Sequence, residues 1–466
     1  MRFFNMRPVS MRRWFIALTA LLLCAPLAAQ TTLRVFAGGA SQRPDLTRLL
    51  VADYMRRFPG VRVTVETGGA TSDLQRQYLS TVLNARDPSI DVYLIDIVNP
   101  AQYHGARWLE PLNALLGAPR DVLAPYLPAY TGSNVIDGEL AAMPAWADAM
   151  FLYYRRDLLE KHHQPLPRTW QDLARVARAV QAAEKAQGNH SLQGLSVQGA
   201  PIEGTVCTFL LPYWGQGKRF NDERGRLTLD RAAAAHGLQM WLTMMDDGVI
   251  KRNVAEVRTQ DTTNEFKAGQ VLFAVNWSMG WDRFQNDADS RVRGQVGVMS
   301  MPAMQGGQPA TCLGGWQWAV SAFSRHKAEA ARLVRHLSNA DASRLYAVRG
   351  ALLPSHAALY DDASVLAAMP WVAQARDALA TAQSRPLSPD YPQVSDTIRT
   401  LRWATRVAPT STPLPLTTLT TPAGRNSAQT SANFSAVSGV CSDGFKTTVL
   451  PAAIAGAIFH AAIISG

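Results

Sequence analysis

The sequence DVYLID at residues 91–96 is a nearly continuous apolar run that ends in a carboxylate, a pattern typical of a buried strand. Two strands with alternating apolar residues precede it, at residues 33–35 and 61–65, and each is followed by a segment with apolar residues at helical spacing, at 44–58 and 72–85. Strand, helix, strand, helix and strand joined by short links predict a parallel sheet with right-handed crossovers.

The ends of these strands predict where a ligand binds. Ligands of open parallel sheets lie beyond the carboxyl ends of the strands. Gly38 and Gly39 follow the first strand, and Asp96 ends the third. We therefore expect these three residues at one edge of the sheet.

A second alternating region follows. Thr169 and Asp172 form a variant of the capping box at the start of a helix that Gly188 closes. The apolar pattern predicts two more helices and three more strands. The helices are expected at residues 232–247 and 327–338, and the strands at 271–276, 295–299 and 316–322.

The first 29 residues are typical of an export signal. Arg12 and Arg13 precede an apolar run at residues 14–23, and small residues lead up to Ala29. The run is too short to span a membrane, and no stop-transfer pattern follows it. Lipid attachment at Cys24 is the alternative, but a leucine stands before it where a small residue is usual. We expect cleavage near Ala29 and a periplasmic mature chain.

Charge and cysteine usage narrow the class of protein. The formal net charge is +10, and it becomes +6 without the four arginines of the first 29 residues. The charges of both signs are interspersed, which argues against a nucleic-acid partner. The mature chain keeps Cys207, Cys312 and Cys441, too few for a disulfide scaffold of this size. A bond between Cys207 and Cys312 stays an open possibility.

The composition changes at residue 401. Residues 401–466 contain four basic residues and one acidic residue, whereas the preceding helices are rich in charge. Residues 408–436 are rich in Thr, Pro, Ser and Ala without any period and are expected to be disordered. Residues 449–464 are apolar but short, and they contain Pro451 and His460, so we do not interpret them as a membrane anchor.

Several catalytic motifs are incomplete. The GQGK at residues 215–218 lacks the first glycine and the Ser/Thr of a phosphate-binding loop, and NWSMG at 276–280 lacks the first glycine of a hydrolase nucleophile elbow. His162 and His163 are adjacent and do not have the spacing of a helical zinc pair. We expect no cofactor, no metal and no catalytic residue of these kinds.

The sequence LGGWQW at residues 313–318 is the strongest sign of a ligand site. Trp316 and Trp318 lie on the same side of an extended chain, and Gly314 and Gly315 let another group approach the backbone closely. Apolar rings beside exposed amides suit a sugar. The alternative is that both tryptophans fill a core.

Other aromatic and charged residues are candidates for the same site, because charged groups form strong hydrogen bonds to hydroxyls. Considered alone, each tryptophan is explained by packing in a core, and each charged residue by a solvated or paired position on the surface. They are Trp146, Trp277 and Trp281 among the aromatics, and Asp96, Asp148, Glu203 and Arg385 among the charged residues.

Four segments resemble, in order and spacing, landmarks of the bacterial extracellular solute-binding proteins of the maltose type, which serve ABC importers. They are MPAWADAMFLYYRRDLL at 143–159, PRTW at 167–170, FKAGQ at 266–270 followed by Asn276-Trp277, and 313–320. Residues 91–96 and 385–391 are similar to the branch that binds trehalose and maltose. The resemblance covers roughly residues 31–400.

The resemblance implies a two-lobe α/β fold of the type II periplasmic-binding-protein class, each lobe a mostly parallel sheet flanked by helices. Residues 30–147 and about 272–319 would form the N-terminal lobe, and residues 148–271 and about 320–400 the C-terminal lobe. A disaccharide or short oligosaccharide would bind in the cleft between them. The monomeric, non-enzymatic protein would deliver the sugar to a membrane permease.

The resemblance also implies a role for each candidate. Asp96 and Asp148 would accept hydrogen bonds from sugar hydroxyls, Trp277, Trp316 and Trp318 would stack on ring faces, and Trp146 would lie at the first hinge. Gly314 and Gly315 would donate backbone amides, Arg385 would reach in from the second lobe, and Gln42 and Gln75 would make contacts from the first. We add Gly39, Glu203 and Trp281 as candidates.

Two points depart from the family pattern. The branch frequently has an acidic residue near Gln42, where this chain has Arg43 next in sequence, so the identity of the sugar stays open. The family also continues past residue 400 as a charged amphipathic helix, whereas residues 401–466 have the composition of a divergent or frame-shifted end.

Two other functions are compatible with the sequence. An exported glycoside hydrolase would use two carboxyl groups across one bond, and Asp96 and Asp148 are the candidates. A sensor ectodomain would need a membrane anchor, for which the apolar end of the chain gives little support.

Overall fold

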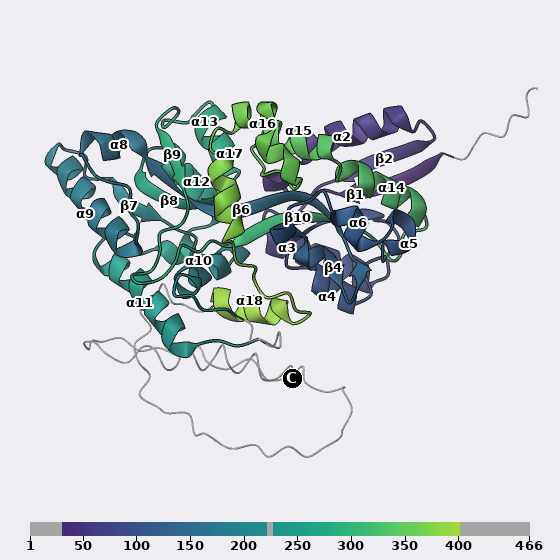
Figure 1. The fold of residues 1–466 in the computed structure, drawn as a ribbon, viewed down its shortest axis with the longest axis horizontal. Coiled ribbons are helices and arrows are strands. Elements are labelled where there is room, and N and C mark those ends of the chain that lie inside the picture. The colour runs from purple at the N-terminus through teal and green to yellow at the C-terminus, as the bar shows by residue number, and fades with distance from the viewer. Residues whose placement is uncertain (1–29, 221–226, 401–466) are drawn as a thin grey trace, which may run out of the picture. The chain divides into compact units, whose positions relative to one another are not determined.

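The computed structural model describes residues 30–220 and 227–400, which form two compact units (Figure 1). The predicted export signal, Cys24 and the atypical segment 401–466 lie outside the described residues. Unit 1 contains the described residues up to Arg156, together with Val275–Met301 and Pro309–Tyr391. Unit 2 contains Asp157–Ala274, Pro302–Gln308 and the described residues from Pro392 onward.

Unit 1 is built on a mixed sheet with the strand order β2-β1-β3-β10-β6. Strand β1 is parallel to both of its neighbours, with Leu33 opposite Val63 and Val35 opposite Val92, which confirms the predicted parallel arrangement. Strand β10 lies between β3 and β6 and is antiparallel to both, so it runs in the opposite direction to the parallel strands beside it. The bounds are β1 Thr31–Phe36, β2 Val61–Glu66, β3 Val92–Asp96, β6 Met143–Arg155 and β10 Leu313–Val320.

Smaller strands and helices complete unit 1. Strand β9 (Val296–Met299) pairs with the last residues of β6, and β4 (Val135–Ile136) pairs with β5 (Glu139–Leu140). The longer helices are α2 Pro44–Arg57, α3 Ser72–Asn84, α14 Lys327–Leu337, α15 Ala340–Gly350 and α17 Val372–Ala380. The short ones are η1 Ala40–Gln42, α4 Pro100–Gly105, α5 Asn113–Leu116, α6 Pro119–Leu123, α7 Pro128–Thr131, η2 Gly132–Asn134, α13 Gly280–Asn286, η4 Ala357–Asp361 and α16 Ala363–Ala368.

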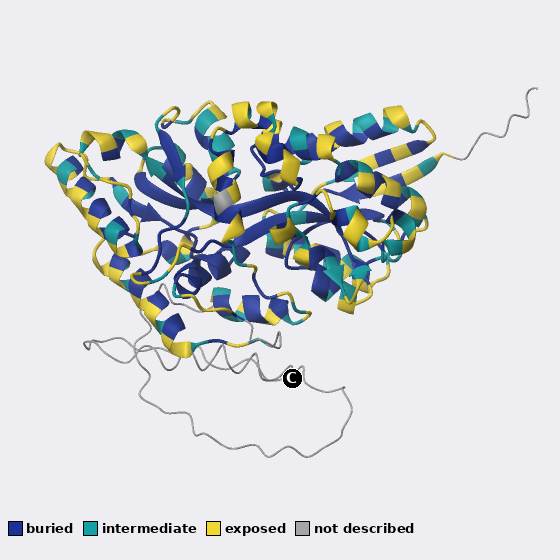
Figure 2. Cartoon of the chain, viewed as in Figure 1, coloured by how far each residue is buried: buried dark blue, intermediate teal, exposed yellow. Residues whose placement is uncertain are grey.

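The two faces of this sheet carry separate cores, because successive side chains of a strand point to opposite faces. In Figure 2, β6 and β10 are buried almost throughout, while β1 and β2 at the edge alternate between buried and exposed residues. The α2/α14 face, which those two helices cover, has Val92, Leu94, Trp318 and Val320 from the strands. The opposite face has Phe36, Tyr93, Ile95 and Ala319, packed with residues of α3 and α4.

The division of the chain differs from the expected one for residues 320–391. The sequence interpretation assigned about 320–400 to the C-terminal lobe, but residues up to Tyr391 belong to unit 1. The physical reason is the amphipathic pattern of α14, whose buried Leu333, Val334 and Leu337 join the core on the α2/α14 face. Tyr346 of α15 also joins that core, and its hydroxyl lies 2.9 Å from Thr47 Oγ1 of α2.

Unit 2 contains a pair of parallel strands and a set of helices. Strand β7 (Gln193–Ser196) pairs with β8 (Val271–Trp277), whose last residues belong to unit 1. The helices are α8 Arg156–Lys161, α9 Trp170–Ala186, α10 Glu203–Trp214, α11 Arg231–Asp246, η3 Val254–Glu256, α12 Thr259–Lys267 and α18 Tyr391–Thr400, of which α8 and α18 begin with a residue of unit 1. Helix α9 begins with the predicted capping box, in which Asp172 N donates to Thr169 Oγ1 at 3.0 Å and Thr169 N donates to Asp172 Oδ2 at 3.2 Å.

Cys207 and Cys312 are both disulfide-bonded. Within residues 30–220 and 227–400, none of the helices combines the length and the apolar composition that a membrane span requires.

Candidate functional site

The register of strand β10 brings the predicted site residues of unit 1 together. Trp316 lies opposite Asp96 of β3 on one side and opposite Trp146 of β6 on the other, and Gly314 lies opposite Asp148 of β6. These residues are far apart in the sequence and meet because β10 lies between β3 and β6. The site therefore has Trp316 on the central strand, Asp96 on one neighbouring strand and Asp148 on the other.

Asp96 is held by three donors and is almost completely buried. Its Oδ1 accepts from Arg385 Nη2 at 3.0 Å and from Val98 N at 3.4 Å, and its Oδ2 accepts from Ser72 Oγ at 2.8 Å. The Asp96 and Arg385 side chains are 9% and 1% exposed, so this ion pair is shielded from water. Removing one partner of such a pair leaves a buried charge uncompensated. The carboxylate therefore has a fixed position.

Arg385 was expected to reach in from the second lobe, and this prediction was wrong. Arg385 belongs to unit 1, the same unit as Asp96. The chain just before it is tied to the start of β10, because Leu313 N donates to Gln383 O at 2.9 Å and Gln383 N donates to Thr311 O at 2.8 Å. These two backbone hydrogen bonds hold the chain so that Arg385 lies next to the carboxylate of Asp96, at the end of β3.

Asp148 is the second carboxylate, and it is buried with two backbone donors. Its Oδ1 accepts from Ala149 N at 2.8 Å and from Ser278 N at 3.0 Å. Burial raises the pKa of Asp148 to about 6, the charge of Asp96 adds to the increase, and the hydrogen bonds from Ser278 and Ala149 oppose it. Asp148 therefore changes its charge close to neutral pH.

The structure separates the tryptophans that the sequence grouped together. Trp316 is partly exposed, whereas Trp318 is 0% and Trp146 is 1% exposed, and both belong to the core on the α2/α14 face. The Trp146 ring lies 4.8 Å from the ring of Tyr346 and 6.3 Å from that of Trp316. For Trp146 and Trp318, the core alternative holds in place of the expected ligand contact.

Gly314 and Gly315 do allow a close approach, but the approaching groups are aromatic rings of the protein. A Cβ atom at Gly314 would lie 2.5 Å from the ring of Trp277, and one at Gly315 would lie 2.2 Å from the ring and hydroxyl of Tyr130. Gly315 also has φ +134°, which side chains rarely adopt. The glycines therefore seat these two rings, a different role from the expected donation of amides to a ligand.

Two buried tyrosines that sequence reasoning missed hold the backbone of the site. The Tyr130 hydroxyl lies within hydrogen-bond distance of Trp146 O and donates to Trp316 O at 2.9 Å. The Tyr153 hydroxyl lies 2.9 Å from Trp277 O and 3.1 Å from Ser278 O. Burial raises the pKa of both phenols, which stay neutral donors. Nothing in the local sequence distinguishes them from ordinary core tyrosines.

The predicted residues of the first strand–helix turn also form a cluster. Gln42 Oε1 accepts from Gly39 N at 2.9 Å and from Gln75 Nε2 at 2.7 Å. Gln75 lies on α3, the helix that begins with Ser72, the partner of Asp96. The expectation that the glycine turn and Asp96 share one edge of the sheet is consistent with this link through α3.

The remaining candidates lie elsewhere. Trp281 is partly exposed on α13, and its ring centroid lies 6.0 Å from that of Trp371. Glu203 begins α10 in unit 2, and its Oε2 accepts from Ser395 Oγ at 2.6 Å. Glu203 is therefore not among the residues that unit 1 brings together.

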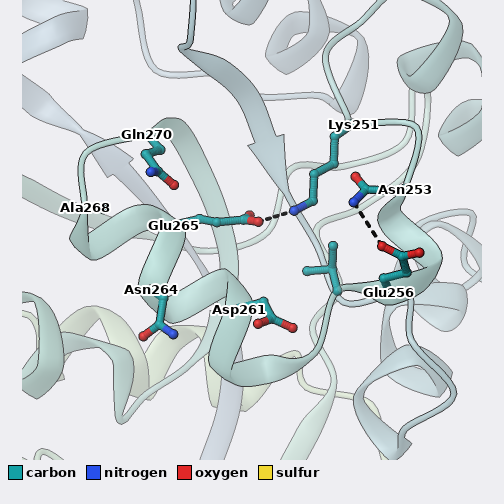
Figure 3. A pocket seen from close by; sticks show the side chains of 9 residues that line it. Lys251, Asn253, Glu256, Asp261, Asn264, Glu265, Ala268 and Gln270 are labelled. Atoms are coloured by element: carbon teal, nitrogen blue, oxygen red, sulfur yellow. Dashed lines mark hydrogen bonds and ion pairs between the residues drawn. The ribbon is translucent and has the colours of Figure 1, made fainter.

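Unit 2 also has a surface pocket of about 410 Å³ that contains none of the predicted residues (Figure 3). Its charged groups have local partners: Lys251 Nζ bonds Glu265, which also accepts from Ser196 Oγ at 2.6 Å, and Asn253 donates to Glu256 at 3.2 Å. These pairs satisfy one another across the pocket wall, so we assign it no ligand. Among the residues that the structure describes, no group of three or more His, Cys, Asp or Glu side chains is placed to hold a metal ion.

Comparisons with known proteins agree with this fold. The family model of the bacterial extracellular solute-binding proteins matches residues 39–343. A probable ABC transporter-binding protein of Deinococcus radiodurans is 33% identical over 351 residues, covering 74% of this chain and 82% of that protein. The mannitol-binding protein of Pseudomonas aeruginosa is 25% identical over 261 residues, covering 54% and 57%.

Among solved structures, the maltose-bound MalE3 of T. maritima is similar to this chain with a TM-score of 0.74 and 28% identity. The match covers 80% of this chain and 94% of that protein. This likeness extends over both units and confirms the expected two-lobe periplasmic-binding-protein fold. Because the family model spans most of the chain and a relative is similar over most of its length, the chain belongs to the bacterial extracellular solute-binding protein family.

Proposed function

We propose that this protein captures a disaccharide or short oligosaccharide of the trehalose and maltose class for the permease of an ABC importer. One observation carries the proposal: the register of β10 sets the partly exposed Trp316 beside Asp96, with Gly314 opposite Asp148. The maltose bound by the similar MalE3 protein supports a sugar of this size. The similar mannitol-binding protein supports a hydroxylated ligand more generally.

The chemistry of the unit 1 residues suits a sugar. Aromatic rings pack against the apolar C–H faces of a sugar ring, and Trp277 and Trp316 are two partly exposed rings next to the carboxylates. Carboxylates accept hydrogen bonds from hydroxyls more strongly than neutral groups do. Asp96 and Asp148 have fixed directions, because each is already bonded to protein donors. The ligand set that we propose in unit 1 is therefore Gly39, Gln42, Gln75, Asp96, Asp148, Trp277 and Trp316.

A matched pair of tryptophan substitutions tests this assignment. Trp316→Leu removes the proposed stacking surface and is expected to weaken the binding of maltose or trehalose about fivefold or more, since an aromatic contact contributes roughly 1 kcal/mol beyond area burial. Trp108→Leu is the control, because Trp108 packs into the core on the opposite face of the same sheet. Isothermal titration calorimetry measures both, and equal losses of affinity would contradict the assignment.

A glycoside hydrolase is the second candidate, and the protonation of Asp148 favours it to a limited degree. A pKa of about 6 resembles that of a general acid, but Asp96, the second carboxyl, is paired with Arg385. Incubating the protein with maltose and with trehalose, followed by chromatography, tests this candidate. We expect both sugars to be recovered intact, and the release of glucose would favour the hydrolase.

A further inference from the structure

Arg43, the residue after Gln42, has an uncommon backbone conformation. It lies between η1 and α2 with φ +52° and ψ +55°, in the left-handed region that residues other than glycine rarely adopt. Such strain persists only where the surrounding contacts hold a residue in place, and it is frequent at ligand sites. The contacts of the Arg43 side chain therefore show what this conformation supports.

The guanidinium of Arg43 contacts two carboxylates on two different elements. Its Nε donates to Asp45 Oδ1 at 3.0 Å and its Nη2 donates to Asp45 Oδ2 at 2.9 Å, so both oxygens of Asp45 hold the planar group. Its Nη1 donates to Asp282 Oδ2 at 3.3 Å, on α13. The hydrogen bond to Asp45 and the charges of Asp45 and Asp282 raise the pKa of Arg43. Asp45 therefore orients the guanidinium, and Nη1 links it to α13.

The ion pair between Arg43 and Asp282 is mostly shielded from water. The two side chains are 17% and 19% exposed. A Cβ atom at Gly350, the last residue of α15, would lie 3.2 Å from Arg43 Nη1. The glycine therefore leaves room for the guanidinium beside α15. The Asp282 carboxylate is also oriented, because its Oδ1 accepts from Asn286 Nδ2 at 2.7 Å.

Helix α13 directly follows the segment that carries one of the proposed stacking rings. Trp277 ends β8, and α13 begins three residues later at Gly280. The turn with Gly39 and Gln42 follows β1 instead. Strands β1 and β8 are not neighbours, since β3, β10 and β6 lie between them in the sheet. The contact of Arg43 with α13 therefore connects two segments of the proposed ligand set that the sheet keeps apart.

We propose that Arg43 is a positioning residue of the sugar site, and that its ion pair with Asp282 fixes α13 and thereby the ring of Trp277. This proposal rests on the sugar-binding function proposed above. A ring stabilises a bound sugar only at close contact, because a gap of about 0.5–1 Å already loses a quarter to a half of the dispersion energy. A small shift of the helix that follows Trp277 therefore lowers the affinity, although Arg43 itself does not contact the ligand.

Asp282→Asn tests the ion pair, because it removes the charge on α13 and keeps an oxygen for Asn286. It is expected to weaken the binding of maltose or trehalose about threefold or more, measured by isothermal titration calorimetry. The thermal unfolding midpoint should fall by no more than about 4 °C, since partly exposed ion pairs contribute little to stability. Asp341→Asn is the matched control: Asp341 is 76% exposed and pairs with Arg344 on its own helix, α15. It is expected to bind as the unaltered protein does.

A second background shows whether the ion pair acts through Trp277. Trp277→Leu removes the stacking ring and weakens binding by itself. If the ion pair acts by placing that ring, Asp282→Asn causes no further loss of affinity in the Trp277→Leu protein. A general structural effect of Asp282→Asn would instead lower the affinity by the same factor in both backgrounds.

The outcomes distinguish this proposal from the proposed function. If the unaltered protein binds neither sugar, the sugar-binding function fails and the positioning role fails with it. If the unaltered protein binds and Asp282→Asn binds equally well, only the positioning role is overturned. An equal loss of affinity in Asp341→Asn, or the same loss of affinity from Asp282→Asn in the Trp277→Leu background, also overturns the positioning role alone.

Arg43→Lys is the second variant, and it decides if Asp282→Asn lowers the thermal unfolding midpoint by more than about 4 °C. Lysine keeps the positive charge but lacks the planar group that bonds Asp45 and Asp282 together. The same loss of affinity is expected from it, again absent in the Trp277→Leu background. Unchanged affinity of Arg43→Lys would then overturn the positioning role.

Discussion

The sequence indicated which residues lie around β10, but it did not show which of them are exposed and which are part of the core. The sequence indicated Asp96, Asp148 and Trp316, and the strand register places these residues close together. The sequence could not show that Trp318 is buried and Trp316 partly exposed. A two-residue period places both on one face of the strand, but it does not show how far the core extends along that face. No sequence pattern indicated Tyr130, because its role exists only in the folded chain. There its hydroxyl contacts the carbonyl oxygens of Trp146 on β6 and of Trp316 on β10.

Asp148 provides a test at the scale of one residue. Its folded pKa of about 6 lies above the ordinary 3.8, so its contribution to stability is complete below pH 3.8 and is lost as the pH rises to 6. Asp148→Asn has no such dependence and keeps an oxygen for the donors Ala149 N and Ser278 N. Relative to the asparagine variant, the unaltered protein should lose up to about 3 kcal/mol between pH 4 and pH 7.

Thermal unfolding midpoints of the two proteins at pH 4, 5, 6 and 7 measure this difference. The midpoint of Asp148→Asn should rise relative to that of the unaltered protein up to about pH 6 and level off above it. Two curves that run parallel over the whole range would show that the Asp148 carboxyl is not the buried group described here.

At the scale of elements, strands and helices with clear periodicity were predicted closely. The helix expected at 327–338 is α14 Lys327–Leu337, and the strand expected at 61–65 is β2 Val61–Glu66. Helix α10 was missed because every one of its residues is buried, so it has no polar face to show a helical period. Strand β6 was noted only as a motif, since a strand buried on both faces shows no alternation. Strand β10 begins three residues earlier than the expected start at 316, because it includes both glycines.

The start of β10 provides a test at this scale. Gly315→Ala is expected to destabilise the protein by about 2 kcal/mol or more, because the new Cβ would lie 2.2 Å from Tyr130 in addition to the strain of φ +134°. Gly117→Ala is the control: Gly117 has φ +114°, but its nearest contact to a new Cβ is Val122 at 3.6 Å. Calorimetric unfolding compares the two, and equal losses would mean that the contact with Tyr130 is unimportant.

At the scale of the whole molecule, the family was identified from the order of its landmarks, whereas the division of the chain was only partly predicted. Residues 320–391 belong to unit 1, since α14 and α15 complete its core. Amphipathic patterns show that a helix has a buried face, but they do not show which sheet covers that face. The export signal at residues 1–29 and the disordered or frame-shifted end at residues 401–466 stay predictions.

The proposed function requires that this protein binds a neutral sugar and does not alter it. The most direct measurement is a calorimetric titration of the full chain with maltose, trehalose and mannitol, followed by chromatography of the recovered ligand. We predict saturable binding of one molecule of maltose or trehalose per chain, with the ligand recovered unchanged and a higher thermal unfolding midpoint in its presence. The absence of binding to all three, or the recovery of cleaved sugar, would contradict the account.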